Sequence, residues 1–127
     1  MGREKQVVGI TGEHIARAFL LKKGYKVMAA NARTPFGEID LVTRHKQTLV
    51  FIEVKTRLSS SLGPPYLNVT WQKQRHLIKN ALCYLKKHRL LLCNWRIDVV
   101  SVKLNESYAA ERIDHFESAV EDNNGYR

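Results

Sequence analysis

Acidic and basic side chains follow a strongly apolar run in the segment Leu49-Val50-Phe51-Ile52-Glu53-Val54-Lys55. Residues two apart in a strand point to the same face, so we expect Glu53 and Lys55 to project side by side. The preceding segment, Gly37-Glu38-Ile39-Asp40-Leu41-Val42, lies one hairpin away, and a tight turn would bring Asp40 across from Glu53 or its neighbour. Burying such charges costs free energy unless they are partnered. Two carboxylates and an ammonium group are therefore expected to share one site.

The predicted site has the chemistry of a divalent-metal centre. Two adjacent carboxylates repel each other, and a hard cation with oxygen ligands, Mg²⁺ or Mn²⁺, would relieve that repulsion and leave positions for water and phosphate. Glu13 is in helical phase with the apolar residues Ala16 and Leu20, so it should face the same sheet, as a third ligand or as a general base acting through water. Lys55 should stay protonated beside the carboxylates and stabilise a phosphorane-like transition state.

The elements that position these residues follow from hydrophobic periodicity. Helical spacing predicts a helix from Gly9 to Gly24, begun by Thr11 as N-cap and ended by Gly24. Three stretches rich in Val, Ile and aromatic residues predict a three-stranded meander over residues 25–32, 37–44 and 48–56. Residues 58–68 contain three serines, a glycine and two prolines, which predicts a loop.

A second helix is predicted over residues 70–88, and a fourth strand over 95–104. The apolar stripe of this helix consists of Leu77, Ile78, Ala81, Leu82 and Leu85. A strand, helix, strand order favours a crossover into a parallel neighbour. We therefore predict a single α/β domain over residues 1–127, with a mixed β-sheet flanked by helices. Its core should span about residues 9–104, and 105–127 should form a polar extension that frays at its end.

The composition indicates a polyanionic partner. Among 127 residues, 44% are hydrophobic, and 21 Lys and Arg exceed 12 Asp and Glu to give a net charge of +9. No apolar run is long enough to span a bilayer, and the polar start shows no signal peptide, so we expect a cytoplasmic protein that binds nucleic acid and no membrane. Cys83 and Cys93 lack CxxC spacing and the histidines are scattered, which argues against a zinc site or a disulfide framework.

Asp40 and Glu53-Val54-Lys55, with Glu13 upstream on a helix, resemble the PD-(D/E)XK nuclease superfamily. Over residues 9–104 the chain also resembles the bacterial YraN-type family. The motifs that carry this second resemblance are Gly12-Glu13, Asn31-Ala32-Arg33, Gly37-Glu38-Ile39-Asp40-Leu41, Phe51-Ile52-Glu53-Val54-Lys55-Thr56-Arg57, Gly63-Pro64 and Lys73. That family is similar to the archaeal Holliday junction resolvases. The resemblance implies a restriction-endonuclease-like core, metal-dependent phosphodiester cleavage, DNA as substrate, branched DNA or repair intermediates included, and a homodimer.

Position by position, the resemblance implies metal ligation by Asp40, Glu53 and the backbone carbonyl of Val54. It implies transition-state stabilisation by Lys55, and Glu13 matches the helical acid of the resolvases. At the junction of loop and helix, Gln72 and Lys73 stand where related nucleases carry a group that contacts phosphate. The proline that usually precedes the first Asp is absent, since Ile39 stands there.

Several further residues have a functional and a structural interpretation. Arg33 and Arg57 either bind phosphate or form exposed ion pairs. The basic residues of the second helix and its end either track phosphates or form a solvated face, and they are Arg75, Lys79, Lys86, Lys87 and Arg89. For Trp71 we favour a position in the core over base stacking. We expect His14 to be exposed rather than to contact substrate. Asp98 is expected to be an ion-pair partner, and Arg96 lies nearby in the sequence.

Three functions compete at this stage. The leading hypothesis is a metal-dependent endonuclease in which Glu13, Asp40, Glu53 and Lys55 are catalytic. The alternative is a module that keeps the nuclease fold and binds nucleic acid without cutting it. The third is an adaptor that uses the aliphatic helix from Leu77 to Leu92 as a partner surface.

Overall fold

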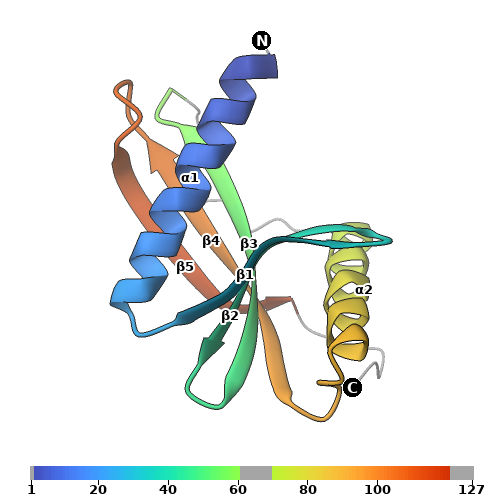
Figure 1. Ribbon diagram of the computed structural model, residues 1–127. Coiled ribbons are helices and arrows are strands. Elements are labelled where there is room, and N and C mark those ends of the chain that lie inside the picture. Colours follow the sequence, from blue (N-terminus) through green and yellow to red (C-terminus); the bar gives the residue numbers. More distant parts are fainter. Residues whose placement is uncertain (1, 61–69, 121–127) are drawn as a thin grey trace.

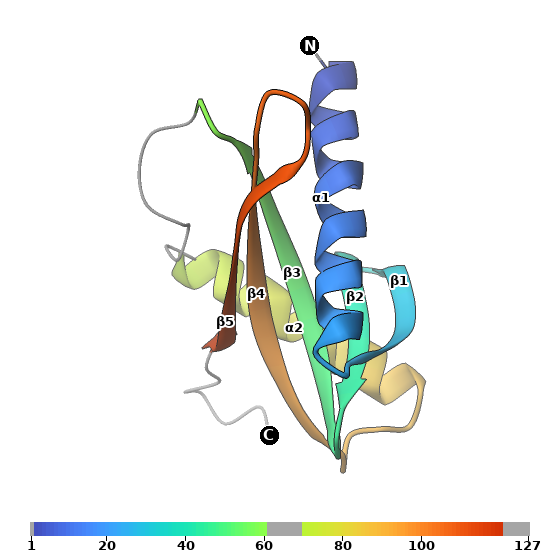
Figure 2. The ribbon, with the colours of Figure 1, turned by 90° about the vertical axis from the view of Figure 1, so that its left-hand side faces the viewer.

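Two helices and one sheet make up the computed structural model, which describes residues 2–60 and 70–120. In chain order the elements are α1 (Gly2–Lys22), β1 (Lys26–Thr34), β2 (Gly37–His45), β3 (Thr48–Leu58), α2 (Trp71–Lys87), β4 (Asn94–Leu104) and β5 (Ala110–Val120). The strands form one five-stranded sheet in the order β1-β2-β3-β4-β5. The two helices lie on opposite faces of this sheet (Figures 1 and 2). None of the helices in the described ranges is long and apolar enough to cross a membrane.

The sheet is mixed, as the sequence predicted. β1, β2 and β3 form an antiparallel meander, and β4 runs parallel to β3 after the α2 crossover. β5 then adds antiparallel to β4. This mixed α/β architecture is compatible with a restriction-endonuclease-like core. Of the predicted loop over residues 58–68, Leu58 is the last residue of β3, whereas 61–68, including Gly63-Pro64, lie outside the described residues.

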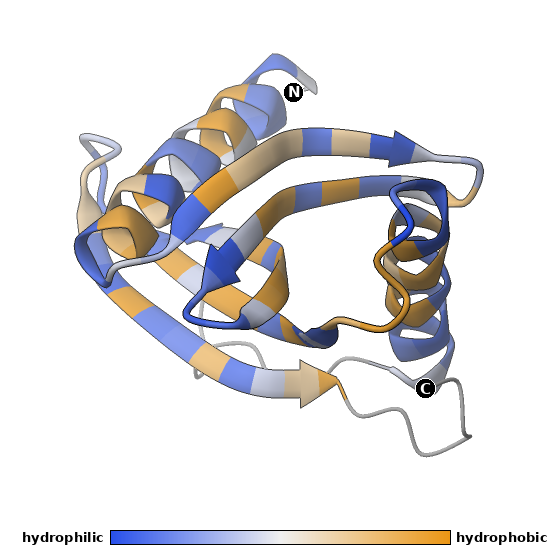
Figure 3. Ribbon diagram, turned by 60° about the horizontal axis from the view of Figure 1, so that its bottom comes forward, coloured by the Kyte–Doolittle hydropathy of each residue, from blue (hydrophilic) through white to orange (hydrophobic). Residues whose placement is uncertain are grey.

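Alternation along the strands builds one apolar layer on each face of the sheet. On the α2 side, Phe51 and Ile97 pack against the helix stripe of Ile78, Ala81 and Leu85. On the α1 side, the buried helix residues Ala16 and Leu20 pack against a second set of strand residues, Leu41, Val50, Ile52, Val100, Val102 and Leu104. Figure 3 shows apolar residues gathered where the helices face the sheet. The central strand β3 is therefore covered on both faces along its first half.

The ends of the helices correct one sequence-based prediction and confirm another. α1 begins at Gly2, and Thr11 is no N-cap, because its hydroxyl donates to the Val7 carbonyl one turn earlier at 2.7 Å. At the other end, Gly24 has a φ of +91°. Its N–H donates to the Leu21 carbonyl at 3.1 Å, and the N–H of Tyr25 reaches back to Leu20 at 3.0 Å, which is the Schellman arrangement. The predicted glycine terminus is confirmed.

The predicted polar extension at residues 105–127 is wrong for residues 110–120, which form β5. Residues 110–112 and 117–118 of this edge strand are exposed, 113–116 and Ala119 are half-buried, and Val120 is buried. Charged and apolar residues follow one another irregularly along β5, so it lacks the apolar alternation by which strands are recognised in a sequence. The core therefore extends beyond residue 104. The predicted fraying of the last residues falls on 121–127, outside the described part of the chain.

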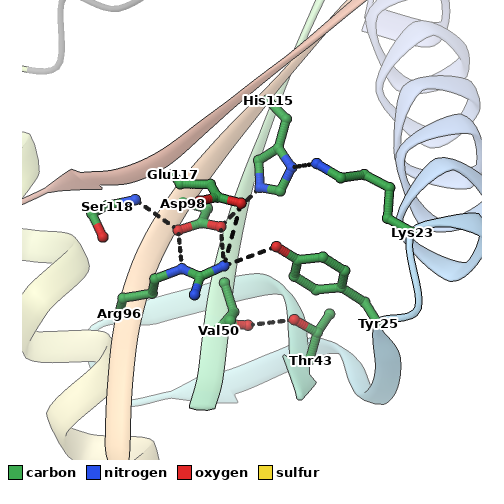
Figure 4. Close-up of polar contacts among 9 residues, drawn as sticks. All are labelled: Lys23, Tyr25, Thr43, Val50, Arg96, Asp98, His115, Glu117 and Ser118. Atoms are coloured by element: carbon green, nitrogen blue, oxygen red, sulfur yellow. Dashed lines mark hydrogen bonds and ion pairs between the residues drawn. The ribbon is translucent and has the colours of Figure 1, made fainter. Parts of the chain in front are cut away.

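A buried polar network attaches β5 to the rest of the sheet (Figure 4). Asp98 on β4 is fully buried and accepts hydrogen bonds from His115 Nε2 at 2.8 Å, from the Ser118 N–H at 2.9 Å and from Arg96 Nε at 3.0 Å. Lys23 Nζ lies 2.6 Å from His115 Nδ1, and because an ammonium group only donates, the imidazole proton belongs on Nε2. Burial alone would raise the pKa of Asp98, but these hydrogen bonds outweigh it and lower the pKa. The predicted ion pair with Arg96 is confirmed.

Candidate metal and nucleic-acid site

The candidate site lies where β2 separates from β3. Antiparallel pairing of these strands runs from the turn as far as Leu41 opposite Ile52. At the next residue of β2, a side chain links the two strands in place of backbone pairing. The Oδ2 atom of Asp40 accepts a hydrogen bond from the backbone N–H of Val54 on β3 at 2.7 Å. This bond holds the Asp40 carboxylate at the edge of β3, beside Glu53. The meeting of these two acids agrees with the register that the sequence suggested.

The carboxyl groups of Asp40 and Glu53 interact directly. Burial, followed by the charge of Glu53 and a hydrogen bond with its carboxyl group, raises the pKa of Asp40 to about 7. The Val54 N–H and the charge of Lys55 act in the opposite direction but do not restore the ordinary value of 3.8. Two neighbouring carboxylates repel each other when both are ionised, and a bound cation or a shared proton reduces this repulsion.

A close contact between α1 and β3 brings Glu13 to the same place. Gly12 is buried, and a Cβ atom there would lie 1.8 Å from the Thr56 hydroxyl oxygen. Only glycine therefore allows the helix to approach the strand at this point. Glu13, the next residue, lines an open groove of about 910 Å³ together with Asp40 and Glu53. Its pKa is raised by burial and by the Asp40 charge, while a hydrogen bond with Asn31 acts against the rise.

Lys55 lies beside the acids but opens into a neighbouring pocket. This pocket, of about 300 Å³, is lined by Lys55, Thr56, Arg57, Lys73 and Ser101. Burial, with the adjacent Lys73 ammonium group, lowers the pKa of Lys55, although Glu53 and Asp40 act in the opposite direction. The sequence analysis expected Lys55 to stay protonated beside the carboxylates, and this expectation stays a prediction. Neither the burial of Lys55 nor the approach of Lys73 from α2 was visible in the sequence.

The oxygen atoms gathered here suit a small hard cation. Among the residues that the structure describes, no three His, Cys, Asp or Glu side chains form a metal cluster by themselves. The donors are instead the carboxylates of Asp40 and Glu53 and the Val54 carbonyl. In a strand, the C=O and N–H of one residue point to the same neighbour, so this carbonyl points toward Asp40. One or two carboxylates completed by water and substrate oxygens are typical of Mg²⁺, so the donor set fits that ion.

The other predicted nucleic-acid contacts do not converge on this groove. Arg33 pairs with Glu38 at 3.8 Å, and both side chains are exposed. The guanidinium of Arg75 lies 5.3 Å from the Trp71 ring, and Lys79 Nζ lies 5.9 Å from the Phe36 ring. Gln72 and His14 are exposed. Of the weaker basic predictions, Lys73 and Arg57 are the two that line a pocket at the site.

Trp71 corrects a prediction. It is 65% exposed, although the sequence analysis favoured a core position. Trp71 is the first residue of α2, and the buried residues of that helix begin only at Ile78. Helical phase alone does not show that the first turn lies outside the packed region.

Two residues that contribute to the site were missed. Asn31 interacts with Glu13 and has a φ of +51°, a left-handed conformation that asparagine tolerates better than most residues. Its motif, Asn31-Ala32-Arg33, was the available signal. Ser101 stands opposite Lys55 in the parallel pairing of β3 and β4. No sequence signal marked Ser101, because a single serine in a Val-rich strand is unremarkable.

The mixed α/β fold thus carries an open groove lined by Glu13, Asp40 and Glu53, beside a pocket lined by Lys55, Arg57 and Lys73. The chain belongs to the uncharacterised protein family UPF0102, whose model matches residues 12–102. A UPF0102 protein from Trichlorobacter lovleyi is 39% identical over 120 residues, covering 94% of each chain. One from Desulfosudis oleivorans is 44% identical over 103 residues, covering 81% of this chain and 84% of the relative. The family membership confirms the YraN-type resemblance.

Proposed function

We propose that this protein is a Mg²⁺- or Mn²⁺-dependent endonuclease of the PD-(D/E)XK type that hydrolyses phosphodiester bonds in DNA. The observation that carries the proposal is the convergence of Glu13, Asp40 and Glu53 on one open groove at the point where β2 leaves β3. Glu13 lines the same groove, and Lys55 stands two residues beyond Glu53 on the same strand. Repulsion between the Asp40 and Glu53 carboxylates destabilises the folded protein, and this cost supports a functional role for the two residues.

Each residue has a role in this proposal. Asp40, Glu53 and the Val54 carbonyl would hold the ion, which when bound supplies Lewis-acid chemistry and an activated water. Glu13, with its raised pKa and its position on the same groove, would orient a water molecule for attack on the phosphate and accept its proton. Lys55 places positive charge where the phosphate gains negative charge during hydrolysis. The hydrogen bond from Val54 to Asp40 keeps this acid in place.

The proposed substrate follows from charge and from the resolvase similarity. The net charge of +9 favours a polyanion, and the cationic pocket lies directly beside the carboxylates. DNA with branches or repair intermediates is the substrate that similarity to the Holliday junction resolvases suggests. A homodimer would bring two such sites to two strands.

A cleavage assay tests the proposal. Purified wild-type protein is incubated with labelled branched, duplex and single-stranded DNA and with RNA, in Mg²⁺, in Mn²⁺ and in EDTA. We expect metal-dependent cleavage by the wild type and none by Glu53→Gln or Lys55→Ala, each of which should keep its fold. Cleavage that persists in purified Glu53→Gln would contradict the assignment.

A non-cutting nucleic-acid module is the second candidate. It is favoured by the net charge of +9 and by the cationic pocket, which suit binding of a polyanion without requiring catalysis. The distinguishing result is salt-sensitive binding of nucleic acid without product in either metal. That result would mean that Asp40 and Glu53 have no catalytic role.

A further inference from the structure

The pocket beside the carboxylates is lined by three elements, two of which contribute cationic side chains. Lys55 and Arg57 come from β3 and Lys73 from the first turn of α2, while Ser101 is contributed by β4. Thr56 completes the lining, so no carboxylate is present among these five residues. The pocket is therefore electropositive, in contrast to the acidic groove next to it.

Lys55 and Lys73 line the same pocket, so two ammonium groups share one space of about 300 Å³. Two ammonium groups repel, and the repulsion is strongest where water is partly excluded. An anion between them would convert this repulsion into two charge-assisted hydrogen bonds. The two ammonium groups are therefore more favourable energetically with an anion bound between them than without one.

The N-terminus of α2 adds to the same field. Lys73 is the third residue of this 17-residue helix, and the first turn contains no acidic residue. The partial positive charge of the helix end therefore remains uncompensated. The Lys73 backbone N–H already donates a hydrogen bond to the Thr70 hydroxyl oxygen at 3.2 Å. The helix therefore contributes its electrostatic field to the pocket, and this backbone N–H does not donate to a ligand. The donors to a ligand would be side chains.

Ser101 supplies a neutral hydroxyl group at the pocket wall. It is 2% exposed, lines the pocket and pairs in register with Lys55. A hydroxyl group at this wall can donate a hydrogen bond to an oxygen atom of a ligand in the pocket. Three kinds of donor, ammonium, guanidinium and hydroxyl, surround the same space.

We propose that the side of this pocket formed by Lys73, Arg57 and Ser101 binds a second phosphate group of the nucleic-acid strand, next to the phosphate positioned at Asp40 and Glu53, with Lys55 standing between the two. The inference rests on the proposed function and adds a second contact point on the same strand. Successive same-face positions of β3 lie about 7 Å apart. Neighbouring phosphates of one strand are separated by a similar step, so a strand that follows β3 would meet the carboxylates first and the cations next.

Binding of inorganic phosphate tests the pocket without requiring any cleavage. Amide chemical shifts of the metal-free protein are followed by NMR during titration with sodium phosphate, against sodium chloride at the same ionic strength. We expect phosphate-specific, saturable shifts at Thr56, Lys73 and Ser101. They should be retained in Lys26→Ala, which removes an exposed charge on β1, and lost or weakened at least fivefold in Lys73→Ala. Equal effects of chloride and phosphate, or unchanged saturation in Lys73→Ala, would overturn the proposal.

Equilibrium binding of labelled single-stranded and duplex DNA separates this inference from the proposed function. In EDTA, across a series of NaCl concentrations, Lys73→Ala should weaken binding and reduce the slope of log K against log salt by about one. Lys26→Ala should leave the slope unchanged. An unchanged slope in Lys73→Ala overturns the phosphate pocket even if the wild type cuts DNA. Phosphate-specific shifts without any DNA binding overturn the nuclease proposal and the assignment to a nucleic-acid strand together.

Discussion

The Oδ2 atom of Asp40 accepts a hydrogen bond from the backbone N–H of Val54 at 2.7 Å. This contact continues the link between β2 and β3 after their backbone pairing has ended at Leu41 and Ile52. It gives Asp40 two roles that conflict. The residue bridges two strands, yet its buried carboxylate lies against that of Glu53.

Replacing Asp40 by Asn separates these two roles. The amide oxygen can still accept from the Val54 N–H, while the repulsion with Glu53 disappears. We expect Asp40→Asn to raise the free energy of unfolding of the metal-free protein at pH 8 by about 1 to 3 kcal/mol, in urea denaturation. Asp40→Ala, which also loses the bridge, should be less stable than Asp40→Asn. A less stable Asp40→Asn with an unchanged m-value would show that the carboxylate does not strain the fold.

The stability of the metal-free protein should depend on pH in the neutral range. The folded-state pKa of Asp40 is about 7, above its ordinary value of 3.8, so the folded state binds an extra proton between these values. The free energy of unfolding should therefore increase as pH falls from 8 to 5, with a slope of at most about 1.4 kcal/mol per pH unit. Urea denaturation in EDTA measures this slope, and Asp40→Asn should flatten it.

Mg²⁺ should stabilise the protein more at pH 8 than at pH 6. At the lower pH the ion has to displace the proton that Asp40 retains, whereas at pH 8 it meets two ionised carboxylates. Melting temperatures with Mg²⁺ and with EDTA, at both pH values, provide the measurement. A metal-induced increase that is equal at pH 6 and pH 8 would argue against ligation by Asp40, and Glu53→Gln should reduce the increase at both.

Gly12→Ala should disturb the site without touching an acid. The new methyl group would lie 1.8 Å from the Thr56 hydroxyl oxygen, so α1 must move away from β3 and take Glu13 with it. We expect a loss of about 1 to 3 kcal/mol in stability and a large loss of any metal-dependent cleavage. Gly9→Ala is the matched control, because a Cβ there meets nothing within 4 Å and alanine favours the helix. Equal stability of the two variants would contradict the packing argument.

The Asp98 network should govern acid stability and leave the metal site unaffected. The folded-state pKa of Asp98 is lowered from 3.8, so its contribution is present above that value and is lost as pH falls below it. Asp98→Asn should cost about 3 kcal/mol in urea denaturation at pH 7, and less at pH 3. Asp114→Asn, which breaks the more exposed pair with Arg112, should cost under about 1 kcal/mol. If the loss of unfolding free energy caused by Asp98→Asn were the same at pH 3 and pH 7, the charge of Asp98 could not be the source of the stabilisation.

Much of the fold could be predicted because the relevant signals are local. Glycine at residue 24 ends α1, enrichment in Val, Ile and aromatic residues marks the strands β1 to β4, and the apolar stripe of α2 selects the face that packs on the sheet. The proximity of Asp40 to Glu53 also follows from a local rule, since a short hairpin turn determines which residues of two strands face each other. These features depend on residues that are near one another in the chain.

From the sequence alone follow the α/β class, the meander of the first three strands with a parallel crossover to the fourth, and the two acids that share a strand end. The remaining features depend on tertiary contacts. Burial, together with the approach of Lys73 where α2 crosses over the sheet, lowers the pKa of Lys55. β5 is held by Asp98, far from it in the chain, and Trp71 is exposed because packing starts only further along α2. Burial and charge proximity arise from contacts between distant segments, and no local pattern encodes their strength.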